Sequence, residues 1–452
     1  MSFLLQEEFV VKFNRKSRPY TATLTTRGVT FKPLDILKGR IIHIPKTFLI
    51  SCQSNLASEE ENGLFQLIAF DPETFKIKTY NVHSLPSLTE PEAVSLIWIQ
   101  AFQRCFPLSD LPDNKNILAL VNPKAGQGMA KKMSEKICPI FQSVGFQLNI
   151  VQTRHANHGK DIVINADLTK FGTILIFSGD GLVHEVMNGI YEREDTKDIF
   201  QRVNIVPFPV GSGNGLNRSL VHFSGYRFDG RGINFALFNV LRGRPTSIDS
   251  FLVQQENLED RIGFLSLTYG IIADIDIESE GLRSLGALRF TVWAMHRISS
   301  RKNYQVKISY LKAKGHQANQ YDLPPLEEDL PDSWDHEQDE FTAVNIVNMP
   351  YIGEREWIAP SCDPNDGLLW MLIIRKEAKK TDLCKIFIEV ETGKHVKIEG
   401  VDMFPIIGFR LEPTNDNGCL SLDGEVLETR AVQGIVRPKS WKTLTRLNAI
   451  KK

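Results

Sequence analysis

The beginning of the chain alternates hydrophobic and polar residues with the two-residue period of β-strands. Strand-like runs occupy residues 20–31, 40–44, 48–52, 64–70 and 76–82, and Gly, Pro and acidic residues separate them. A helix is predicted after these strands, because Thr89, Pro91 and Glu92 have the spacing of an N-cap, a first-turn proline and a capping-box glutamate. Residues 1–110 are therefore expected to form a small β-rich module that ends in a helix.

The rest of the chain shows two different patterns, which predict two further domains. From Asn116, apolar runs alternate with helix-length segments, as in βαβ units, so residues 111–246 are expected to form an α/β domain with a parallel sheet. From Ser247, strand-like runs dominate, and residues 247–452 are expected to form a mostly antiparallel β-sandwich. Residues 311–340 are polar and acidic, with too little apolar surface to offset the entropy of ordering, so they are predicted to be a flexible insertion.

Composition and charge exclude several classes of protein. The 452 residues, 42% of them hydrophobic, are enough for two or three cores. The formal net charge of −1 argues against a nucleic-acid-binding protein, which needs a strongly basic surface. The cysteines contain no CxxC pair that would indicate a zinc site. Acidic residues near the amino terminus are untypical of a signal peptide, and no long apolar run indicates a membrane span, so a cytoplasmic location is expected.

Two glycine-rich turns in the α/β region have the features of phosphate-binding loops. NPKAGQG at residues 122–128 and GSGNG at residues 211–215 each follow an apolar run and lead into a helical segment, where backbone N–H groups can approach an anion. The first turn lacks the Gly-Lys-Ser/Thr of a Walker loop, and the second lacks a convincing acidic ribose partner for a dinucleotide. Taken alone, each turn can also be an ordinary β-to-α connection.

Between these two turns, a third glycine-rich turn carries a carboxylate. Asp180 stands between Gly179 and Gly181 at the predicted carboxyl end of a strand, which is the edge of an α/β sheet where ligands bind. Glu185 and Asn188 follow in the first turns of the next helix and can point to the same crevice. The alternative interpretation is that Asp180 only caps this helix.

The order of the three turns resembles the catalytic region of the diacylglycerol and sphingosine kinase superfamily. The residues that carry the resemblance are NPKAGQG, SGDGLVHEVMNG and PVGSGNG. The run ADIDIESE at residues 273–280, with Arg283 and Arg289 after it, resembles the stretch that distinguishes sphingosine kinases, and LDGE at residues 422–425 matches that family's last nucleotide motif. The chain departs from the family at Gly215, where alanine is more usual, in the acidic insertion and in the amino-terminal module.

The resemblance implies a lipid kinase that uses ATP and Mg²⁺, with an α/β nucleotide-binding domain and a lipid-binding β-sandwich. Asp180 is the implied general base for the substrate hydroxyl, and Ser178, Gly179 and Gly181 are implied to contact the substrate beside it. Arginines and Mg²⁺ would neutralise the transferred phosphoryl group. The implied ATP site consists of Asn122, Pro123, Lys124, Thr153, Arg154, His155, Ala156, Asn157, Glu185, Gly211, Ser212, Gly213, Arg283, Arg289, Asp423, Gly424 and Glu425. The carboxylates of Asp423 and Glu425 could hold the metal or its waters.

Asp276 is the residue expected to select the substrate. Sphingosine carries an ammonium group that a carboxylate can pair with, whereas ceramide and diacylglycerol are neutral and would leave the carboxylate uncompensated. A sphingoid base, phosphorylated to sphingosine 1-phosphate, is therefore the implied substrate. Ceramide or diacylglycerol kinase activity is the alternative, and it is favoured if the amino-terminal module, which resembles a pleckstrin-homology unit, is a true one. A silent lipid-binding scaffold or a kinase of soluble substrates fits the intact motifs less well.

Residues 289–304, RFTVWAMHRISSRKNY, mix apolar and basic side chains at helical spacing. A basic amphipathic helix suits an anionic membrane surface or a calmodulin-like protein. The alternative is a helix that faces the core and keeps its arginines in solvent. The corresponding region of sphingosine kinases faces the membrane, so peripheral recruitment of a cytoplasmic protein to membranes is expected.

Overall fold

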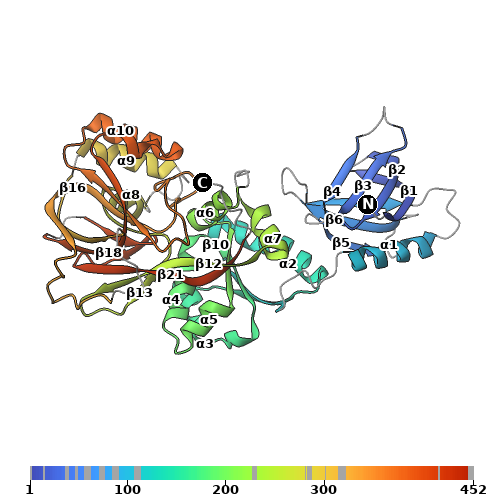
Figure 1. Cartoon of the computed structure of the whole chain (residues 1–452), viewed down its shortest axis with the longest axis horizontal. Helices are drawn as coiled ribbons and strands as arrows, with labels where there is room; N and C mark the ends of the chain where they lie inside the picture. Colours follow the sequence, from blue (N-terminus) through green and yellow to red (C-terminus); the bar gives the residue numbers. More distant parts are fainter. Residues whose placement is uncertain are drawn as a thin grey trace. The chain divides into compact units, whose positions relative to one another are not determined.

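The structure is a computed structural model of the whole chain (Figure 1). It describes residues 3–13, 16–35, 40–45, 49–54, 63–70, 77–83, 91–105, 114–225, 232–279, 281, 288–300, 302–313, 322–415 and 418–445. The chain divides into two compact units. The first contains residues 1–116, 136–148 and 233–244, and the second contains residues 117–135, 149–232 and 245–452.

The amino-terminal part is a seven-stranded antiparallel sheet followed by one helix. Its strands have the order β4-β3-β2-β1-β7-β6-β5. They are β1 (Phe3–Phe13), β2 (Lys16–Thr25), β3 (Gly28–Pro33), β4 (Ile42–Pro45), β5 (Leu49–Ser54), β6 (Gly63–Phe70) and β7 (Ile77–His83), and helix α1 (Pro91–Cys105) follows them. Trp98 of α1 is buried against Phe9 and Phe65, and it stacks on Phe65 with ring centroids 5.7 Å apart. The helix therefore closes the core of this sheet.

The strands and helix of the amino-terminal part agree with the sequence pattern except at the beginning. The predicted runs all overlap strands, and α1 begins at Pro91, the residue predicted to lie in its first turn. Thr89, the predicted N-cap, lies outside the described residues. Strand β1 was not predicted, because the acidic pair Glu7 and Glu8 interrupts its apolar run. Its pairing with β2 and β7 shows that tertiary contacts, rather than alternation, set this strand.

The α/β part is built on parallel strands with buried faces. It contains the strands β8 (Asn116–Val121), β9 (Gln147–Gln152), β10 (Thr173–Ser178) and β11 (Asn204–Pro209) and the helices α2 (Met129–Ser143), α3 (His158–Asn165), α4 (Asp180–Tyr191), α5 (Thr196–Arg202), α6 (Gly215–Phe223) and α7 (Ile233–Arg242). Strand β10 pairs in parallel with both β8 and β11. Every residue of β10 and β11 is buried, as expected when helices cover both faces of a parallel sheet. The three glycine-rich turns follow the carboxyl ends of β8, β10 and β11.

The carboxyl-terminal part is mostly antiparallel β-structure, as predicted. Its strands are β12 (Arg244–Gln255), β13 (Arg261–Gly263), β14 (Ser266–Gly270), β15 (Tyr304–Lys312), β16 (Asp335–Val347), β17 (Leu369–Arg375), β18 (Val401–Pro413), β19 (Leu420–Leu422), β20 (Glu425–Leu427) and β21 (Val432–Thr445), and its helices are α8 (Ile271–Glu278), α9 (Leu288–Ser300) and α10 (Lys380–Glu389). Strand β21 pairs with β18 and also, in parallel, with β11. One sheet therefore continues from the β-rich part into the α/β part, whereas the sequence suggested two separate domains.

The predicted flexible insertion at residues 311–340 differs from the structure over its described residues. Strand β15 extends to Lys312 and β16 begins at Asp335, so regular structure enters both ends of the segment. Between them, the guanidinium group of Arg410, only 4% exposed, donates hydrogen bonds to the carbonyl groups of Pro325, Leu326 and Glu328. The acidic segment is thus held by its backbone, which composition cannot reveal. Residues 314–321 lie outside the described residues.

Replacing Arg410 should destabilise the protein. Arg410→Met leaves three carbonyl groups without their donor, and we expect the free energy of unfolding to fall by about 2–4 kcal/mol, measured by urea denaturation. Limited proteolysis should cut within residues 322–334 faster than in the wild type. Arg355→Met is the matched control, because the Arg355 side chain is 76% exposed and its loss should change stability by less than about 0.5 kcal/mol. Equal stability of both variants would contradict the role of Arg410.

Candidate active site

The three glycine-rich turns form one continuous surface of backbone groups. The N–H of Asn122 donates to the carbonyl of Phe177 at 3.1 Å, which joins the first turn to the second. The N–H of Gly211 donates to the carbonyl of Ser178 at 3.2 Å, and that of Asp180 donates to Gly213 at 3.1 Å. These bonds cross between neighbouring parallel strands. The structure therefore brings together the turns that the sequence places far apart.

Close backbone contact explains why these turns need glycine. A Cβ at Gly179 would lie 2.5 Å from the carbonyl oxygen of Gly213, and a Cβ at Gly211 would lie 2.4 Å from the Cα of Gly179. Gly126 has a φ of 57°, and a Cβ there would lie 2.1 Å from the carbonyl oxygen of Val210. These contacts are shorter than any side chain allows. The glycines thus serve the packing of the turns as well as any approach to phosphate.

Asp180 is buried at the start of α4 and binds the N-terminus of a different helix. Its Oδ2 accepts a hydrogen bond from the N–H of Gly215 at 2.6 Å, and its Oδ1 accepts one from Leu216 at 3.3 Å. These groups begin α6, so Asp180 caps α6 and not its own helix. Burial raises the pKa of Asp180 to about 7, although the two amides oppose the shift. A carboxylate with this pKa can accept a proton near neutral pH.

Gly215, the position where the chain departs from the family pattern, is constrained by the segment that packs on α6. A Cβ at Gly215 would lie 2.7 Å from the carbonyl carbon of Ile352 and 2.8 Å from its oxygen. The neighbouring Asn214 donates from Nδ2 to Oε1 of Glu354 at 2.9 Å. Alanine is excluded here because the backbone of Ile352 occupies the space of its methyl group. The same contact fixes the amide that holds Asp180.

Asp423 is a junction between α4 and the β-rich part. Its carboxylate accepts hydrogen bonds from Nδ1 of His184 at 3.0 Å and from the N–H groups of Leu265 at 2.8 Å and Ser266 at 3.0 Å. The N–H of Phe264 also points to it. With its oxygens taken up by these donors, the Asp423 carboxylate does not fit a metal ligand. Sequence reasoning missed His184, although its place one helical turn after Asp180 was a signal.

Two other polar residues of α4 have different surroundings from those expected. Asn188 does not line the crevice, because it exchanges hydrogen bonds with the backbone of Ile262 in β13. The Oε2 of Glu185 accepts a hydrogen bond from the N–H of Gly159 at 2.8 Å. Burial raises the pKa of Glu185, and hydrogen bonds from the backbone of Gly159 and Asn157 oppose the shift. Glu185 therefore lies beside the turn at residues 153–157, which the implied ATP site includes.

The turn at residues 153–157 is anchored at its first residue and exposed beyond it. The N–H of Thr153 donates to the carbonyl of Val121 at 2.9 Å, so this turn begins beside the first glycine-rich turn. The side chains that follow it are exposed, and they are Arg154, His155, Ala156 and Asn157. In the first turn Asn122 and Pro123 are partly buried and Lys124 is exposed, and in the last turn Ser212 is exposed. The turn at residues 153–157 and the first and last glycine-rich turns therefore all offer polar groups to solvent at the same edge of the sheet.

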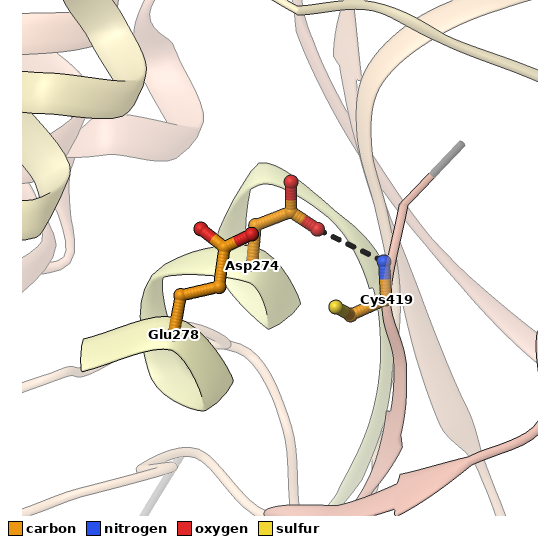
Figure 2. Close-up of side chains that lie close together, drawn as sticks. All are labelled: Asp274, Glu278 and Cys419. Atoms are coloured by element: carbon orange, nitrogen blue, oxygen red, sulfur yellow. Dashed lines mark hydrogen bonds between the residues drawn. The ribbon is translucent and has the colours of Figure 1, made fainter. Parts of the chain in front are cut away.

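Asp274 lies at the centre of a buried ionic cluster on α8. It accepts a hydrogen bond from the hydroxyl of Tyr304 at 2.7 Å. It also accepts one from the N–H of Cys419 at 2.9 Å, which is drawn in Figure 2. The guanidinium group of Arg297 lies 3.5 Å away, and the ammonium group of Lys302 lies 3.8 Å away. Two cations thus face this carboxylate from α9 and the residues after it.

The same cluster contains the three side chains whose ligand atoms lie close enough for a metal ion, Asp274, Glu278 and Cys419 (Figure 2). Glu278 already pairs with Arg297 and accepts a hydrogen bond from Nε1 of Trp293. Burial raises the pKa of Cys419 to about 11, so its thiol keeps its proton. Among the described residues, Asp274 and Glu278 therefore form an ion-pair network with Arg297 and Lys302, which joins α8 to α9 and balances the two negative charges without a metal.

Asp276, two residues after Asp274, lies next to the turn that follows Asp423. A Cβ at Gly424 would be 3.7 Å from Oδ2 of Asp276, and Asp276 is partly buried. The exposed Glu425 follows Gly424 in the same turn and lies beside Gly181, because a Cβ at Gly181 would be 3.2 Å from its Oε1. The structure thus brings Glu425 to the turn that carries Asp180, and it brings Asp276 to the neighbouring turn at Gly424. Arg283 and the side chain of Arg289 lie outside the described part of the chain.

Comparisons with known proteins match the α/β part and the β-rich part to two kinase-related domain families. The model of the diacylglycerol kinase catalytic domain matches residues 116–253, and that of the YegS C-terminal NAD kinase beta sandwich-like domain matches residues 268–445. A solved structure of a diacylglycerol kinase from Bacillus anthracis superposes with a TM-score of 0.51 over 74% of this chain and 98% of that chain. At 18% identity, this similarity shows the fold alone.

Curated relatives are more similar in sequence than that structure. Sphingosine kinase 1 of Rattus norvegicus is 32% identical over 353 residues, which cover 74% of this chain and 91% of the relative. Sphingosine kinase 1 of Homo sapiens is 31% identical with the same coverage. Sphingoid long chain base kinase 5 of Saccharomyces cerevisiae is 26% identical over 74% of this chain and 59% of the relative. The three turns, the acidic α8 and these matches together show that the chain belongs to the sphingosine kinase family.

Proposed function

We propose that this protein is an ATP-dependent kinase that transfers the γ-phosphate of ATP to the primary hydroxyl of sphingosine or a related sphingoid base. The observation that carries the proposal is the position of Asp180, a buried carboxylate with a pKa of about 7 at the meeting point of three glycine-rich turns. The 32% identity to a sphingosine kinase over nine-tenths of its length supports the same activity. Residues 116–253 are the ATP-binding part in this proposal, and residues 268–445 are the lipid-binding part.

Asp180 acts as the general base in this reaction. The substrate oxygen forms a bond to the γ-phosphorus while the bond from that phosphorus to the β–γ bridging oxygen breaks, and ADP leaves. The hydroxyl proton passes to Asp180. The amides of Gly215 and Leu216 stabilise the charged form of Asp180, whereas burial stabilises the neutral form, so the group can exchange a proton near neutral pH. Ser178, Gly179 and Gly181 shape the floor on which the hydroxyl rests.

The nucleotide binds along the glycine-rich turns. We assign its phosphates to the backbone groups of residues 122–124 and 211–213, with residues 153–157 and Glu185 beside them. Arg283 and Arg289 carry the positive charge that the transferred phosphoryl group needs. Gly424 and Glu425 close the site, and Asp423 positions them through His184 rather than binding the nucleotide directly.

Mg²⁺ fits one carboxylate of this site better than the other. Both oxygens of Asp423 already accept hydrogen bonds from protein donors. Glu425 is exposed beside Gly181, so it is the side chain that would hold the ion or its waters. Mg²⁺ usually combines one or two carboxylates with phosphate oxygens and water, which one exposed glutamate satisfies. When bound, the ion neutralises charge on the phosphates of ATP.

Asp276 pairs with the ammonium group of the substrate. Its neighbour Asp274 contacts Tyr304, Arg297 and Lys302, and we assign it a structural role that differs from that of Asp276. Asp276 lies by the turn at Gly424, on the side of the site that also holds Glu425. A carboxylate here favours a cationic lipid head over the neutral heads of ceramide and diacylglycerol.

The amino-terminal module and α9 are the parts that we assign to recruitment. Seven antiparallel strands followed by one closing helix support a pleckstrin-homology-like fold for residues 1–110. On α9, Val292 and Met295 are 50% and 56% exposed. None of the helices that the structure describes has the length and apolar character needed to span a bilayer. We propose that the protein is cytoplasmic and that α9 contacts an anionic membrane surface, with a calmodulin-like protein as a competing partner.

Removing the carboxylate of Asp180 should stop turnover. Asp180→Asn is expected to lower kcat with sphingosine, ATP and Mg²⁺ by about 10²- to 10⁴-fold, measured by transfer of radiolabelled phosphate. In the wild type, kcat/KM should rise with pH through about 7 as Asp180 loses its proton. Asp198→Asn, at a side chain 65% exposed on α5, should keep full activity. Parallel assays with ceramide and diacylglycerol decide between the substrates, and faster turnover of either would support the alternative kinase.

Asp180 should also make stability depend on pH. Its folded-state pKa is raised, so the folded protein binds this proton more tightly than the unfolded chain does. The resulting stability is present below about pH 4 and is lost as the pH rises through about 7. The melting temperature of Asp180→Asn relative to the wild type should therefore increase between these values. A constant difference across that range would contradict the raised pKa.

Asp276 should determine the preference for a cationic lipid. Asp276→Asn is expected to lower kcat/KM for sphingosine at least about tenfold more than for a neutral lipid, the factor that corresponds to about 1.4 kcal/mol. The KM for ATP should stay unchanged, because the substitution removes a contact with the lipid head only. Competition between sphingosine and ceramide in one reaction measures the ratio directly. Equal losses for both lipids would rule out the ion pair.

Exposed apolar side chains of α9 should contribute to membrane binding. The double substitution of Val292→Asp and Met295→Asp is expected to weaken sedimentation with phosphatidylserine-containing vesicles by about tenfold or more, because two apolar side chains no longer enter the bilayer. Activity towards sphingosine dissolved in detergent should persist. Ile150→Asp is the control, since Ile150 is 45% exposed on β9, outside the proposed surface. Unchanged vesicle binding by the double variant would refute the role of α9.

A further inference from the structure

Asn345 is a buried polar side chain near the end of β16 that has no hydrogen-bond partner among the described residues. It lies in β16 and has no exposed surface. Neither its Oδ1 nor its Nδ2 has a partner among the described residues. A buried amide group left unpaired is unfavourable, because it has lost its hydrogen bonds to water without gaining others. Its presence here calls for a partner beyond the described residues.

Two other polar residues share the sheet face of Asn345. Thr268 of β14 is directly paired with Asn345, and it is also directly paired with Ser421 of β19. Residues paired in this way point to the same face of a sheet. The hydroxyl of Ser421 is buried and likewise has no partner among the described residues. Ser421, Thr268 and Asn345 form what we call the polar row.

The face that carries the polar row is less closely packed than the opposite face. On β14, Ser266 and Thr268 keep 5% and 7% of their surface exposed, whereas Leu267 and Tyr269, which point the other way, have none. Beyond Asn345, the next residue across the sheet is the apolar Leu372, paired with Met403. The polar row therefore continues into an apolar part of the same sheet.

Strand β14 connects the polar row to the proposed reaction site. The N–H of Ser266, at the start of the strand, donates to Asp423. The strand ends at Gly270, after which α8 carries Asp276. Thr268 is two residues from Ser266, about 6–7 Å along the strand. The polar row and Asp276 are therefore carried by consecutive elements that both reach the turn at Asp423 and Gly424.

We propose that the polar row binds a hydroxyl group on the alkyl chain of the substrate, so that the preferred sphingoid base is one hydroxylated just beyond its amino-diol head. This inference rests on the proposed sphingoid base kinase activity. A hydroxyl both donates and accepts, and it matches the Oδ1 and Nδ2 of one amide group. A plain alkyl chain would leave the amide unpaired. A site built to bind a hydroxyl rejects the analogue that lacks it.

The test compares two bases that differ by one hydroxyl group. Sphinganine and 4-hydroxysphinganine are offered separately to the wild type and to Asn345→Leu, which replaces the amide by an apolar side chain of similar size. We expect the wild type to show a higher kcat/KM for the hydroxylated base. In the variant this preference should fall at least about tenfold, while kcat/KM for sphinganine stays equal or rises. Ser421→Ala should change the preference in the same direction.

The control separates recognition from a general effect of removing a buried polar atom. Thr443 on β21 has a buried hydroxyl without a partner among the described residues, outside the polar row. Thr443→Val should leave the preference between the two bases unchanged. The melting temperature of Asn345→Leu should equal or exceed that of the wild type, because an unpaired amide has been removed.

Isothermal titration with both bases, without ATP, distinguishes failure of this inference from failure of the proposed activity. Tighter binding of 4-hydroxysphinganine by the wild type than by Asn345→Leu supports the polar row even if no base is phosphorylated. Phosphorylation of both bases at a ratio that Asn345→Leu leaves unchanged overturns it. Equal binding of both bases by the wild type also overturns it.

Discussion

The hydrogen bonds between the Asp180 carboxylate and the first two N–H groups of α6 are the interaction on which this site depends. They place the negative charge of a buried acid at the positive end of a helix, which stabilises the charge that burial opposes. The helix start is fixed in turn by the backbone of Ile352, which leaves no space for a side chain at Gly215. The pKa of Asp180 therefore depends in part on the packing of Ile352 against Gly215, far from Asp180 in the sequence.

A second set of contacts joins the two matched regions of the chain. Asp423 receives donors from α4, through His184, and from the backbone that leads into β14. Strand β21 pairs with both β18 and β11, so one sheet continues through both regions. These contacts hold the turn at Gly424 and Glu425 next to Asp180, and they hold α8 nearby. The nucleotide and lipid functions that we propose thus share one rigid framework.

Buried charge is distributed unequally over the acidic stretch of α8. Asp274 is satisfied by a tyrosine, a backbone amide and two cations, so it fixes α8 against α9. Asp276 lies on the turn side of the helix instead. In the function that we propose, alternate acids of one short helix have different roles, with Asp274 fixing the helix and Asp276 binding the substrate. The unpaired Asn345 is the opposite case, because nothing among the described residues satisfies it.

The sequence by itself determined the order of the parts and the chemistry of the turns. Alternation predicted the amino-terminal strands, apolar runs predicted β8, β10 and β11, and glycines marked the turns where Asp180 lies, because these signals depend on neighbouring residues only. It did not reveal the bonds from Asp180 to α6, the contact of His184 with Asp423, or the docking of the acidic segment by Arg410. Each of these joins residues between 35 and 239 positions apart or depends on burial. Only the tertiary structure decides such contacts, since the free energy of a charge or amide depends on what surrounds it.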